Sequence, residues 1–250
     1  MAGIGLDPTK VQPALLRWIE ATDIPIAVTP KAKGLVPEDH RLFVATSTGM
    51  AGDTLFVELL RETDLLVGIG FDPVEAIRTF YVNRPFLSVA QYSLVDRQFA
   101  PDLELVGDVS ATLEALQGEA TLHHTWAQEP LVSFRRRLAS FLTPSADRSE
   151  LGLSPARLFG RLRTLTPRDT ILTVDTGAHK LLIGQVWPAY EPLTYFVSHG
   201  LSTMGYALPA AMSTAVPLEM TATRFPRLVY NAALTGSATM ASHAAATPGE

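Results

Sequence analysis

Two segments of this chain combine polar and small residues in a pattern that is typical of ligand-binding turns. The first, Asp175-Thr176-Gly177-Ala178-His179, directly follows the apolar run 171–174. In parallel α/β sheets ligands bind at the carboxyl ends of strands, where the free backbone N–H groups of a following helix favour anions. The segment therefore predicts an anion-binding turn at the start of a helix. A structural interpretation stays open beside it, in which Asp175 caps the helix and His179 satisfies a hydrogen bond in the core.

The second segment, residues 198–211, follows the apolar run 195–197 and places Met204 among small residues. Small residues allow a backbone to approach a ligand closely, and methionine is a flexible apolar side chain that adapts to what it contacts. Both features suit a binding loop. On the residues alone, packing in the core is the simpler interpretation of Met204.

Both segments need a scaffold, and the first 120 residues show the βαβ pattern of a parallel sheet. Helical spacing of apolar residues predicts helices over 8–22 and 53–63, the second with Asp53 as its N-cap. The other elements predicted in this half are strands over 24–29, 65–70, 86–90 and 103–106, and a helix over 110–116 capped by Ser110. The run 65–70 lacks polar alternation, which predicts a strand buried on both faces. Residues 1–120 are thus expected to form a Rossmann-like central domain.

The sheet pattern stops over residues 121–150, where a helical segment near 131–142 precedes a polar stretch with Pro and Ser. We expect this region to be a linker. The α/β pattern resumes over 151–250, with strands at 171–174 and 195–197. The predicted fold class is therefore α/β, with two Rossmann-like parallel-sheet domains, the second incomplete. After about residue 214 the periodicity fades, so we expect an aberrant tail that contributes no packed sheet strand.

Composition excludes several classes of protein. The chain has 250 residues, 20 Lys plus Arg against 25 Asp plus Glu, a formal net charge of −5 and no cysteine. It lacks the basic footprint of a nucleic-acid-binding protein, and the missing thiols exclude disulfide scaffolds and cysteine catalysis. The longest uncharged stretch, 193–218, is interrupted by Ser, Gly and Pro too often to cross a membrane. Residues 1–7 have no signal-peptide features, so the expected location is cytoplasmic.

The segment 29–40, with the sequence TPKAKGLVPEDH, resembles the central domain of thiamine-diphosphate-dependent enzymes of the acetolactate synthase type. Segments 49–52, 64–72 and 107–109 follow it in that family's order. Segments 175–179 and 198–211 resemble the start of the family's diphosphate-binding domain, the second through the pattern G-x-x-x-M-G-x-x-x-P-A-A. The resemblance covers residues 1 to about 215.

The resemblance implies cofactor-binding residues of two kinds. Four in a turn would hold the diphosphate through the backbone and three would support the pyrimidine ring: Thr176, Gly177, Ala178 and His179, then Ser202, Thr203 and Met204. In such enzymes the bent cofactor forms its own ylid, which attacks a 2-keto acid. The resemblance therefore implies thiamine diphosphate and Mg²⁺ as cofactors, a 2-keto acid as substrate and a homo-oligomer as the assembly.

The central domain of this family binds FAD in some members, ADP in others and nothing in many. The positions that would line such a nucleotide here are Gly3, Gly5, Gly49, Met50, Gly70, Phe71, Asp72, Gly107 and Asp108. FAD sites in the family usually use acidic anchors on the loop after the strand at 86–90, and residues 90–93 include none. We therefore expect weak or absent nucleotide binding.

Two features of the family have no counterpart in this sequence. The glutamate that protonates the aminopyrimidine belongs to an N-terminal pyrimidine-binding domain, and this sequence begins after the point where that domain would end. Metal binding needs an aspartate in a G-D-G turn, but the nearest match, 234–237, has Ser237 there, a poor ligand for Mg²⁺. No catalytic residue and no metal ligand is therefore assigned, and the binding of both cofactors by this chain is in question.

Two hypotheses about function follow. In the first, the chain is a fragment of a thiamine-diphosphate-dependent 2-keto acid decarboxylase or carboligase that is inactive alone and is completed by a separate chain carrying the pyrimidine domain. In the second, it is a non-catalytic nucleotide-binding or interaction module derived from that family. The missing glutamate and G-D-G turn favour the second hypothesis, whereas the retained Met204 and segment 175–179 favour the first.

Overall fold

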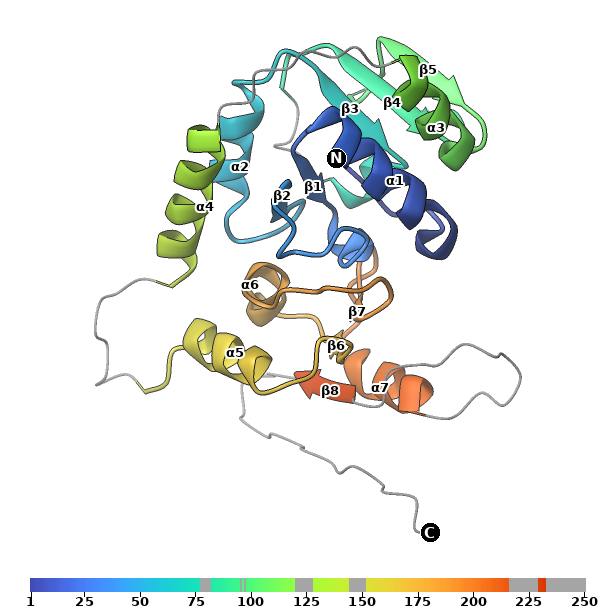
Figure 1. Cartoon of the computed structure of the whole chain (residues 1–250). Helices are drawn as coiled ribbons and strands as arrows, with labels where there is room; N and C mark the ends of the chain where they lie inside the picture. The colour runs from blue at the N-terminus through green and yellow to red at the C-terminus, as the bar shows by residue number, and fades with distance from the viewer. Residues whose placement is uncertain are drawn as a thin grey trace.

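Parallel strands flanked by helices form two α/β domains, which lie one above the other in Figure 1. The computed structural model describes residues 1–76, 82–94, 96, 98–119, 128–143, 152–215 and 229–232. The upper, central domain contains the elements up to α4, and the lower, C-terminal domain contains those from α5 onward. The predicted fold class, α/β with two parallel-sheet domains, is confirmed.

The central domain is built on parallel strands that pair in two sets: β1 (Ile26–Val28) with β2 (Phe43–Thr46), and β3 (Leu66–Ile69) with β4 (Phe86–Ala90) and β4 with β5 (Leu103–Val106). Ala2 joins the two sets because it bridges Val28 on one side and Ile69 on the other. The backbone N–H of Gly3 donates to the Ile69 carbonyl at 3.0 Å. Residues 1–3 therefore lie between β1 and β3 and make the sheet continuous.

Helices cover both faces of this sheet: α1 (Pro8–Thr22) and α3 (Val109–Glu119) on one face, α2 (Asp53–Leu60) and α4 (Gln128–Leu142) on the other. Side chains alternate between the faces along β1, since Ile26 and Val28 pack with α1 and α3 while Ala27 packs with α2 and α4. α1 spans the predicted residues. The Asp7 carboxylate caps it by accepting the Thr9 N–H at 3.1 Å.

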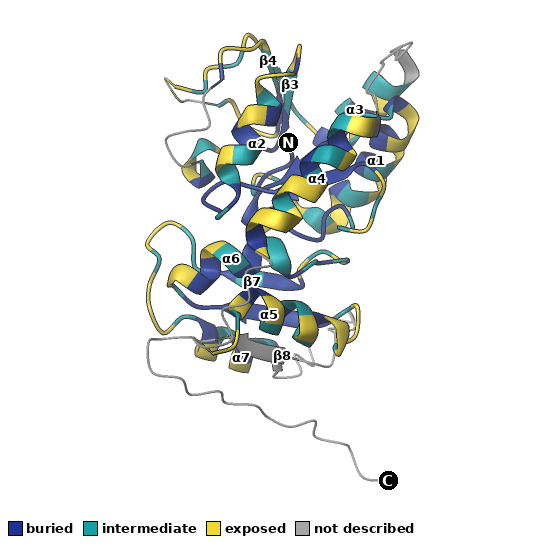
Figure 2. Cartoon of the chain, turned by 90° about the vertical axis from the view of Figure 1, so that its left-hand side faces the viewer, coloured by how far each residue is buried: buried dark blue, intermediate teal, exposed yellow. Residues whose placement is uncertain are grey.

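Helix α4 lies in the region that the sequence assigns to a linker, and this assignment is wrong for its residues. Leu131 and Phe134 recur at helical spacing and are buried against α2, with the Phe134 and Phe56 ring centroids 6.2 Å apart. Figure 2 looks onto the outer side of α4, where exposed and half-buried residues predominate. A 15-residue amphipathic helix with its own place in the core is part of the central domain.

Asp53 does not cap α2 as predicted, because Gly52 precedes the helix. Its carboxylate instead accepts hydrogen bonds from the loop after β2: from the N–H groups of Gly49 (2.6 Å) and Met50 (2.9 Å) and from the Ser47 hydroxyl (2.8 Å). Burial raises the pKa of Asp53, and these donors oppose that shift. Asp53 therefore fixes the shape of loop 47–50.

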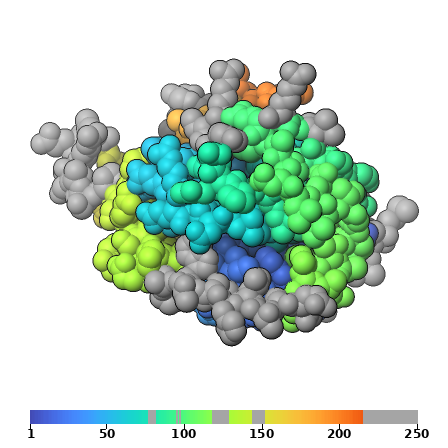
Figure 3. All heavy atoms as spheres, turned by 90° about the horizontal axis from the view of Figure 1, so that it is seen from above, coloured from blue at the N-terminus to red at the C-terminus, as the bar shows by residue number. Residues whose placement is uncertain are grey.

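Strand β3 is less buried than the sequence predicts. Leu66 and Val67 are only half-buried, and Leu65 beside them is 50% exposed. A cavity of about 770 Å³ opens here, lined mainly by apolar side chains from the sheet, α1 and α2. Figure 3 shows the hollow from above, with the N-terminal residues in blue at its base. An uninterrupted apolar run thus marks a strand with one face partly open.

The C-terminal domain has a smaller parallel sheet in the order β7 (Tyr195–Val197), β6 (Ile171–Val174), β8 (Val229–Ala232). Its helices are α5 (Pro155–Thr164), α6 (Ala178–Val186) and α7 (Ala207–Ala215). Phe159, Leu172 and Ile183 are buried together in its core. The predicted strands at 171–174 and 195–197 are confirmed.

Strand β8 contradicts the expectation that no sheet strand follows residue 214. Val229 pairs with Ile171, and Tyr230 with Leu172, in parallel register. β-Branched and aromatic residues suit a pleated strand. β8 occupies the edge of β6 that faces away from β7. The rest of the expected aberrant tail, 216–228 and 233–250, lies outside the described residues. Within the described ranges, no helix has both the length and the apolar character to span a bilayer.

If α4 is part of the central core, truncating its buried side should destabilise the protein. We expect Phe134→Ala to lower the free energy of unfolding by about 3–5 kcal/mol, because it empties a packed site beside Phe56. Phe141→Ala, on the same helix but 55% exposed, should change it by less than about 0.5 kcal/mol. Urea unfolding of both variants checks this. If both substitutions change the free energy of unfolding by the same small amount, α4 is a linker and not part of the core.

Candidate functional site

The two predicted binding segments meet at the carboxyl end of β6, and Asp175 joins them. Its buried carboxylate accepts the N–H groups of Thr176 (2.7 Å), Gly205 (2.9 Å) and Ala207 (3.2 Å). The first donor belongs to segment 175–179 and the other two to segment 198–211. Asp175 is therefore a bridge between the segments and does not cap α6, which has Gly177 at its N-cap.

Two opposing effects act on the Asp175 carboxyl. Burial alone would raise its pKa, but the backbone hydrogen bonds from Thr176, Ala207, Gly205 and Tyr206 outweigh it and hold the pKa below the usual value. Hydrogen bonds to the charged form stabilise it in this way. Asp175 is therefore ionised in the physiological pH range. Both of its carboxylate oxygens accept hydrogen bonds from backbone N–H groups.

Residues 176–179, which we call the cofactor turn, lead directly into α6. Gly177 has φ 150° and ψ 175°, a conformation almost confined to glycine. The helix then begins at Ala178, so the N–H groups of Ala178 and His179 have no intrahelical acceptor, while that of Lys180 donates to the Gly177 carbonyl at 3.0 Å. The positive end of the helix dipole lies at the turn. The predicted helix start is confirmed, and anion binding at it stays a prediction.

His179 and Lys180 add two buried basic side chains at this end of α6. His179 is hydrogen-bonded to the backbone of Asp175, and its Nε2 has no partner among the described residues. The Lys180 ammonium donates to the Ser198 carbonyl at 2.8 Å and to the Ser202 hydroxyl at 3.2 Å. Burial lowers the pKa of both side chains. His179 therefore keeps one ring nitrogen free to bind something else.

The loop 198–206 closes the site on its other side. Ser202 has φ 48°, the N–H of Thr203 donates to the Ser198 hydroxyl at 3.1 Å, and the Thr176 hydroxyl donates to the Thr203 carbonyl at 3.4 Å. Met204 is 74% exposed, so core packing is the wrong interpretation of this side chain. Leu201 in the same loop, and Leu208 and Met212 in α7, are exposed apolar residues as well. The hydrogen bond between Thr176 and Thr203 places the loop beside the cofactor turn.

Lys180 and His199 are not among the predicted site residues. Burial, together with the charges of Lys180 and Lys31, lowers the pKa of His199 to about 4, and its Nδ1 has no described partner. Both residues stand next to predicted positions in the sequence. The sequence does not show where the side chains of Lys180 and His199 point, because their orientation depends on how β7 and the central domain pack against α6.

A metal site is not formed by the part of the chain that the structure describes. No group of three or more His, Asp or Glu side chains is placed to hold an ion there. Asp175 is the acidic residue closest in sequence to the cofactor turn, and its oxygens already accept backbone N–H groups. Ser237, which the sequence comparison places at the metal position, lies outside the described residues. The described residues therefore supply no ligand set for Mg²⁺.

The predicted nucleotide-lining glycines at the start of the chain pack against each other. The Gly5 N–H donates to the Gly70 carbonyl at 2.8 Å, and a Cβ on Gly3 would lie 2.8 Å from that oxygen. The Ile4 N–H donates to the buried Glu75 carboxylate at 2.9 Å. A phosphate would have to displace this carboxylate. The packing is consistent with weak or absent nucleotide binding, which stays a prediction.

Two family models match the chain. "Thiamine pyrophosphate enzyme, central domain" matches residues 1–116, and "Thiamine pyrophosphate enzyme, C-terminal TPP binding domain" matches residues 175–246. The second match contains Asp175, the cofactor turn and Met204. It also continues past residue 214, which together with β8 counts against an aberrant tail.

Curated relatives are acetolactate synthases. A catabolic acetolactate synthase of Raoultella terrigena is 30% identical over 186 residues, 72% of this chain and 33% of that protein. The acetolactate synthase of Bacillus subtilis is 25% identical over 209 residues, 81% of this chain and 37% of that protein. The acetolactate synthase isozyme 2 large subunit of Escherichia coli is 28% identical over 222 residues, which are 86% of this chain and 39% of that protein. The chain spans about a third of the length of these relatives.

The bridging role of Asp175 predicts a pH-dependent stability effect. We expect Asp175→Asn to lower the free energy of unfolding at pH 7 by about 2 kcal/mol, because the amide leaves buried N–H groups without acceptors. The folded-state pKa is below the unfolded one, so this stabilisation is present above about pH 4 and is lost as the pH falls through the folded-state value. Urea unfolding at pH 7 and at pH 3 should show the difference from wild type shrinking. A difference that is equal at both pH values, or matched by exposed Asp64→Asn, contradicts the bridge.

Proposed function

This chain belongs to the thiamine pyrophosphate enzymes, and we propose that it binds the diphosphate end of thiamine diphosphate at the cofactor turn, as part of an enzyme that acts on 2-keto acids. The observation that carries the proposal is the start of α6, where Gly177 and free backbone N–H groups form an anion site beside two buried basic side chains. The acetolactate synthases among its relatives support the substrate class.

The donors at the cofactor turn suit a diphosphate. The N–H groups at the start of α6 supply neutral donors and the helix dipole favours negative charge. Lys180 supplies a cation that is held by Ser198 and Ser202, and the free Nε2 of His179 can carry a proton to an anionic oxygen. When bound, thiamine diphosphate supplies the electron sink for making or breaking the carbon–carbon bond next to a ketone.

The exposed apolar surface beside the turn suits the rest of the cofactor. Met204, with Ser202 and Thr203, would support the rings of the bound cofactor, as the family resemblance implies. Leu201, at 95% exposure, would be covered when a further protein surface closes over the site. We propose that this surface is a pyrimidine-binding domain, supplied by the same polypeptide, a separate chain or a second copy in a cytoplasmic homo-oligomer.

A non-catalytic module derived from the same family is the alternative. It is favoured by the lack of a metal-ligand group in the described ranges. The glycine-only backbone at Gly177 and the exposed Met204 favour cofactor binding, because neither feature serves the stability of the domain. A measurement of thiamine diphosphate binding therefore distinguishes the proposed cofactor-binding function from the non-catalytic module.

Calorimetric titration with thiamine diphosphate tests the proposal. We expect it to bind, and thiamine without its diphosphate to bind at least about tenfold more weakly, because the described donors face the diphosphate. Mg²⁺ should change the affinity little. Failure of folded protein to bind thiamine diphosphate at millimolar concentration, or equal binding of thiamine, contradicts the proposal.

The same titration should depend on pH through His179. Since burial lowers the pKa of His179 and an anion favours its protonated form, affinity should rise as the pH falls from 8 to 6. In His179→Gln the affinity should rise less as the pH falls. Any pH dependence of the affinity that remains in this variant comes from protonation of the diphosphate itself. An identical pH profile in the variant would show that His179 does not face the anion.

By itself the chain should not release CO₂ from pyruvate. No described residue supplies the glutamate or the metal ligands that the family uses, so bound cofactor would not be activated. The measurement is CO₂ release with thiamine diphosphate and Mg²⁺ against a blank without protein. Cofactor-dependent release well above the blank would contradict this prediction.

A further inference from the structure

A buried ion pair lies where the two domains meet. Lys33 follows the short helix η1 (Pro30–Ala32), and its side chain is fully buried beside that of Glu38. Burial lowers the pKa of Lys33 and raises that of Glu38, while the attraction between them opposes both shifts. Charges taken out of water in this way need every hydrogen bond satisfied. The acceptors of the Lys33 ammonium therefore show which segments of the chain the ion pair connects.

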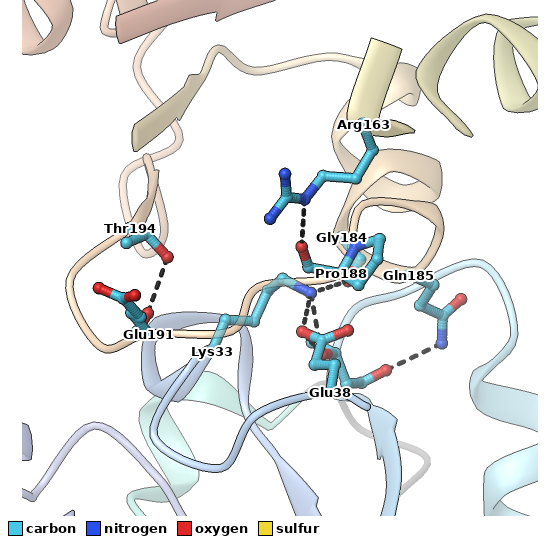
Figure 4. A network of polar contacts seen from close by, with 9 residues as sticks. Lys33, Glu38, Arg163, Gly184, Gln185, Pro188, Glu191 and Thr194 are labelled. Carbon is cyan, nitrogen blue, oxygen red and sulfur yellow. Dashed lines mark hydrogen bonds and ion pairs between the residues drawn. The ribbon is translucent and has the colours of Figure 1, made fainter. Parts of the chain in front are cut away.

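One of the Lys33 acceptors belongs to the other domain. The ammonium donates to Glu38, to the Thr46 hydroxyl at 3.2 Å and to the Gly184 carbonyl at 2.9 Å (Figure 4). These acceptors match the three N–H donors of a lysine. Gly184 lies in the last turn of α6, where a cation stabilises the helix by facing the negative end of its dipole. Lys33 thus caps the far end of the helix that begins at the cofactor turn.

Two further contacts hold the same face of α6. The Gln185 amide donates to the Thr46 carbonyl at 2.9 Å and accepts the Gly52 N–H at 2.8 Å. The Ala51 N–H donates to the Leu181 carbonyl at 3.1 Å. Positions 181, 184 and 185 lie on one side of a helix by their spacing. The central domain therefore holds α6 along its last two turns.

The backbone of α6 approaches the central domain closely at Gly184, where an added Cβ would require the Met50 side chain to shift. A Cβ on Gly184 would lie 2.3 Å from the Met50 sulfur. The loop after β2, which the Asp53 carboxylate shapes, carries Met50, Ala51 and Gly52 to the helix. We call Lys33, Glu38, Thr46, Gly184 and Gln185 the interdomain clamp. It combines one ion pair with two hydrogen bonds that cross the domain boundary, from Lys33 to the Gly184 carbonyl and from Gln185 to the Thr46 carbonyl.

We propose that the interdomain clamp sets the position of the cofactor turn, with Lys33 as the positioning residue. This inference rests on the proposed function of the turn. α6 has nine residues, and Gly184 is five residues from His179, about 7.5 Å at a rise of 1.5 Å per residue. A helix this short transmits a shift of one end directly to the other. Displacements of about 1 Å at a reacting group can cost about a hundredfold in rate.

Variants that weaken the clamp without leaving a lone buried charge test the proposal. Lys33→Met/Glu38→Gln removes both charges at similar volume, a change that buried pairs often tolerate. Gln185→Met removes the amide contacts and leaves the ion pair intact. The control is Asp39→Asn/Arg168→Gln, which breaks an exposed 2.8 Å ion pair between the same two domains without touching α6.

Amide hydrogen exchange and pyrophosphate binding are the two measurements. In each clamp variant that melts cooperatively, we expect the hydrogen-bonded amides of Thr176 and Lys180 to exchange about tenfold faster. Amides in β4 should keep wild-type rates in these variants, and the control variant should keep wild-type rates at all of these amides. Calorimetry should show about tenfold weaker binding of pyrophosphate and thiamine diphosphate. A role in stability alone would quicken exchange in β4 as well.

The outcomes separate this inference from the proposed function. If wild type binds no pyrophosphate or thiamine diphosphate, the proposed function fails, and the exchange data still decide whether the clamp holds the turn. Unchanged exchange of the Thr176 and Lys180 amides in the folded variants overturns the inference. Faster exchange with unchanged affinity overturns it as well, because the position of the turn would then not matter for binding.

Discussion

The buried ion pair between Lys33 and Glu38 constrains the arrangement of both domains. An ammonium removed from water is stable only when each of its donors has an acceptor, and one acceptor comes from across the domain boundary, at Gly184. The pair therefore requires α6 to lie against the loop after β2. Lys33 also lies 5.2 Å from the centre of the Tyr195 ring, so that β7 shares the constraint. The TPKAKGLVPEDH segment thus acts in this structure as an interdomain contact.

Asp175 imposes a second constraint of the same kind at the opposite end of α6. One carboxylate gathers N–H groups from two loops that are thirty residues apart in the sequence. Because its charge is used by the backbone, the electrostatics of the site come from other groups: the start of α6, Lys180 and His179. Between the two constraints α6 has a fixed position and a fixed direction. If the turn binds a phosphorylated cofactor as proposed, a fixed helix of this kind keeps its donors in place.

Local patterns in the sequence were sufficient for elements that depend on local physics. Helix α1 has its predicted bounds, with apolar residues at helical spacing and an aspartate before it, and the strands at 86–90 and 171–174 are short apolar runs between turn residues. The turn at 175–179 was predictable as the start of a helix, since Gly177 and the preceding strand are adjacent in sequence. Segment order also identified the family.

Features that depend on distant partners were not predictable in this way. A carboxylate before a helix, such as Asp53, can face the helix or the preceding loop, and the choice depends on which N–H groups lack acceptors. Helix α4 follows a region without sheet pattern, and its core position depends on a gap beside Phe56 that no local pattern encodes. The exposure of Met204 and the contact between Lys33 and Gly184 require knowledge of how two domains dock.

The interdomain clamp couples the two domains into one unit, so they should unfold together. Tryptophan reporters, one in each domain, test this most directly. Trp18 is buried in the central domain and Trp187 in the C-terminal domain. In variants that keep only one of them, with Trp126 and the other replaced by Phe, urea unfolding is followed by fluorescence. Coincident midpoints and slopes for the two reporters are the predicted result. Two separate transitions, with Trp187 reporting unfolding while the Trp18 signal stays native, would contradict the account.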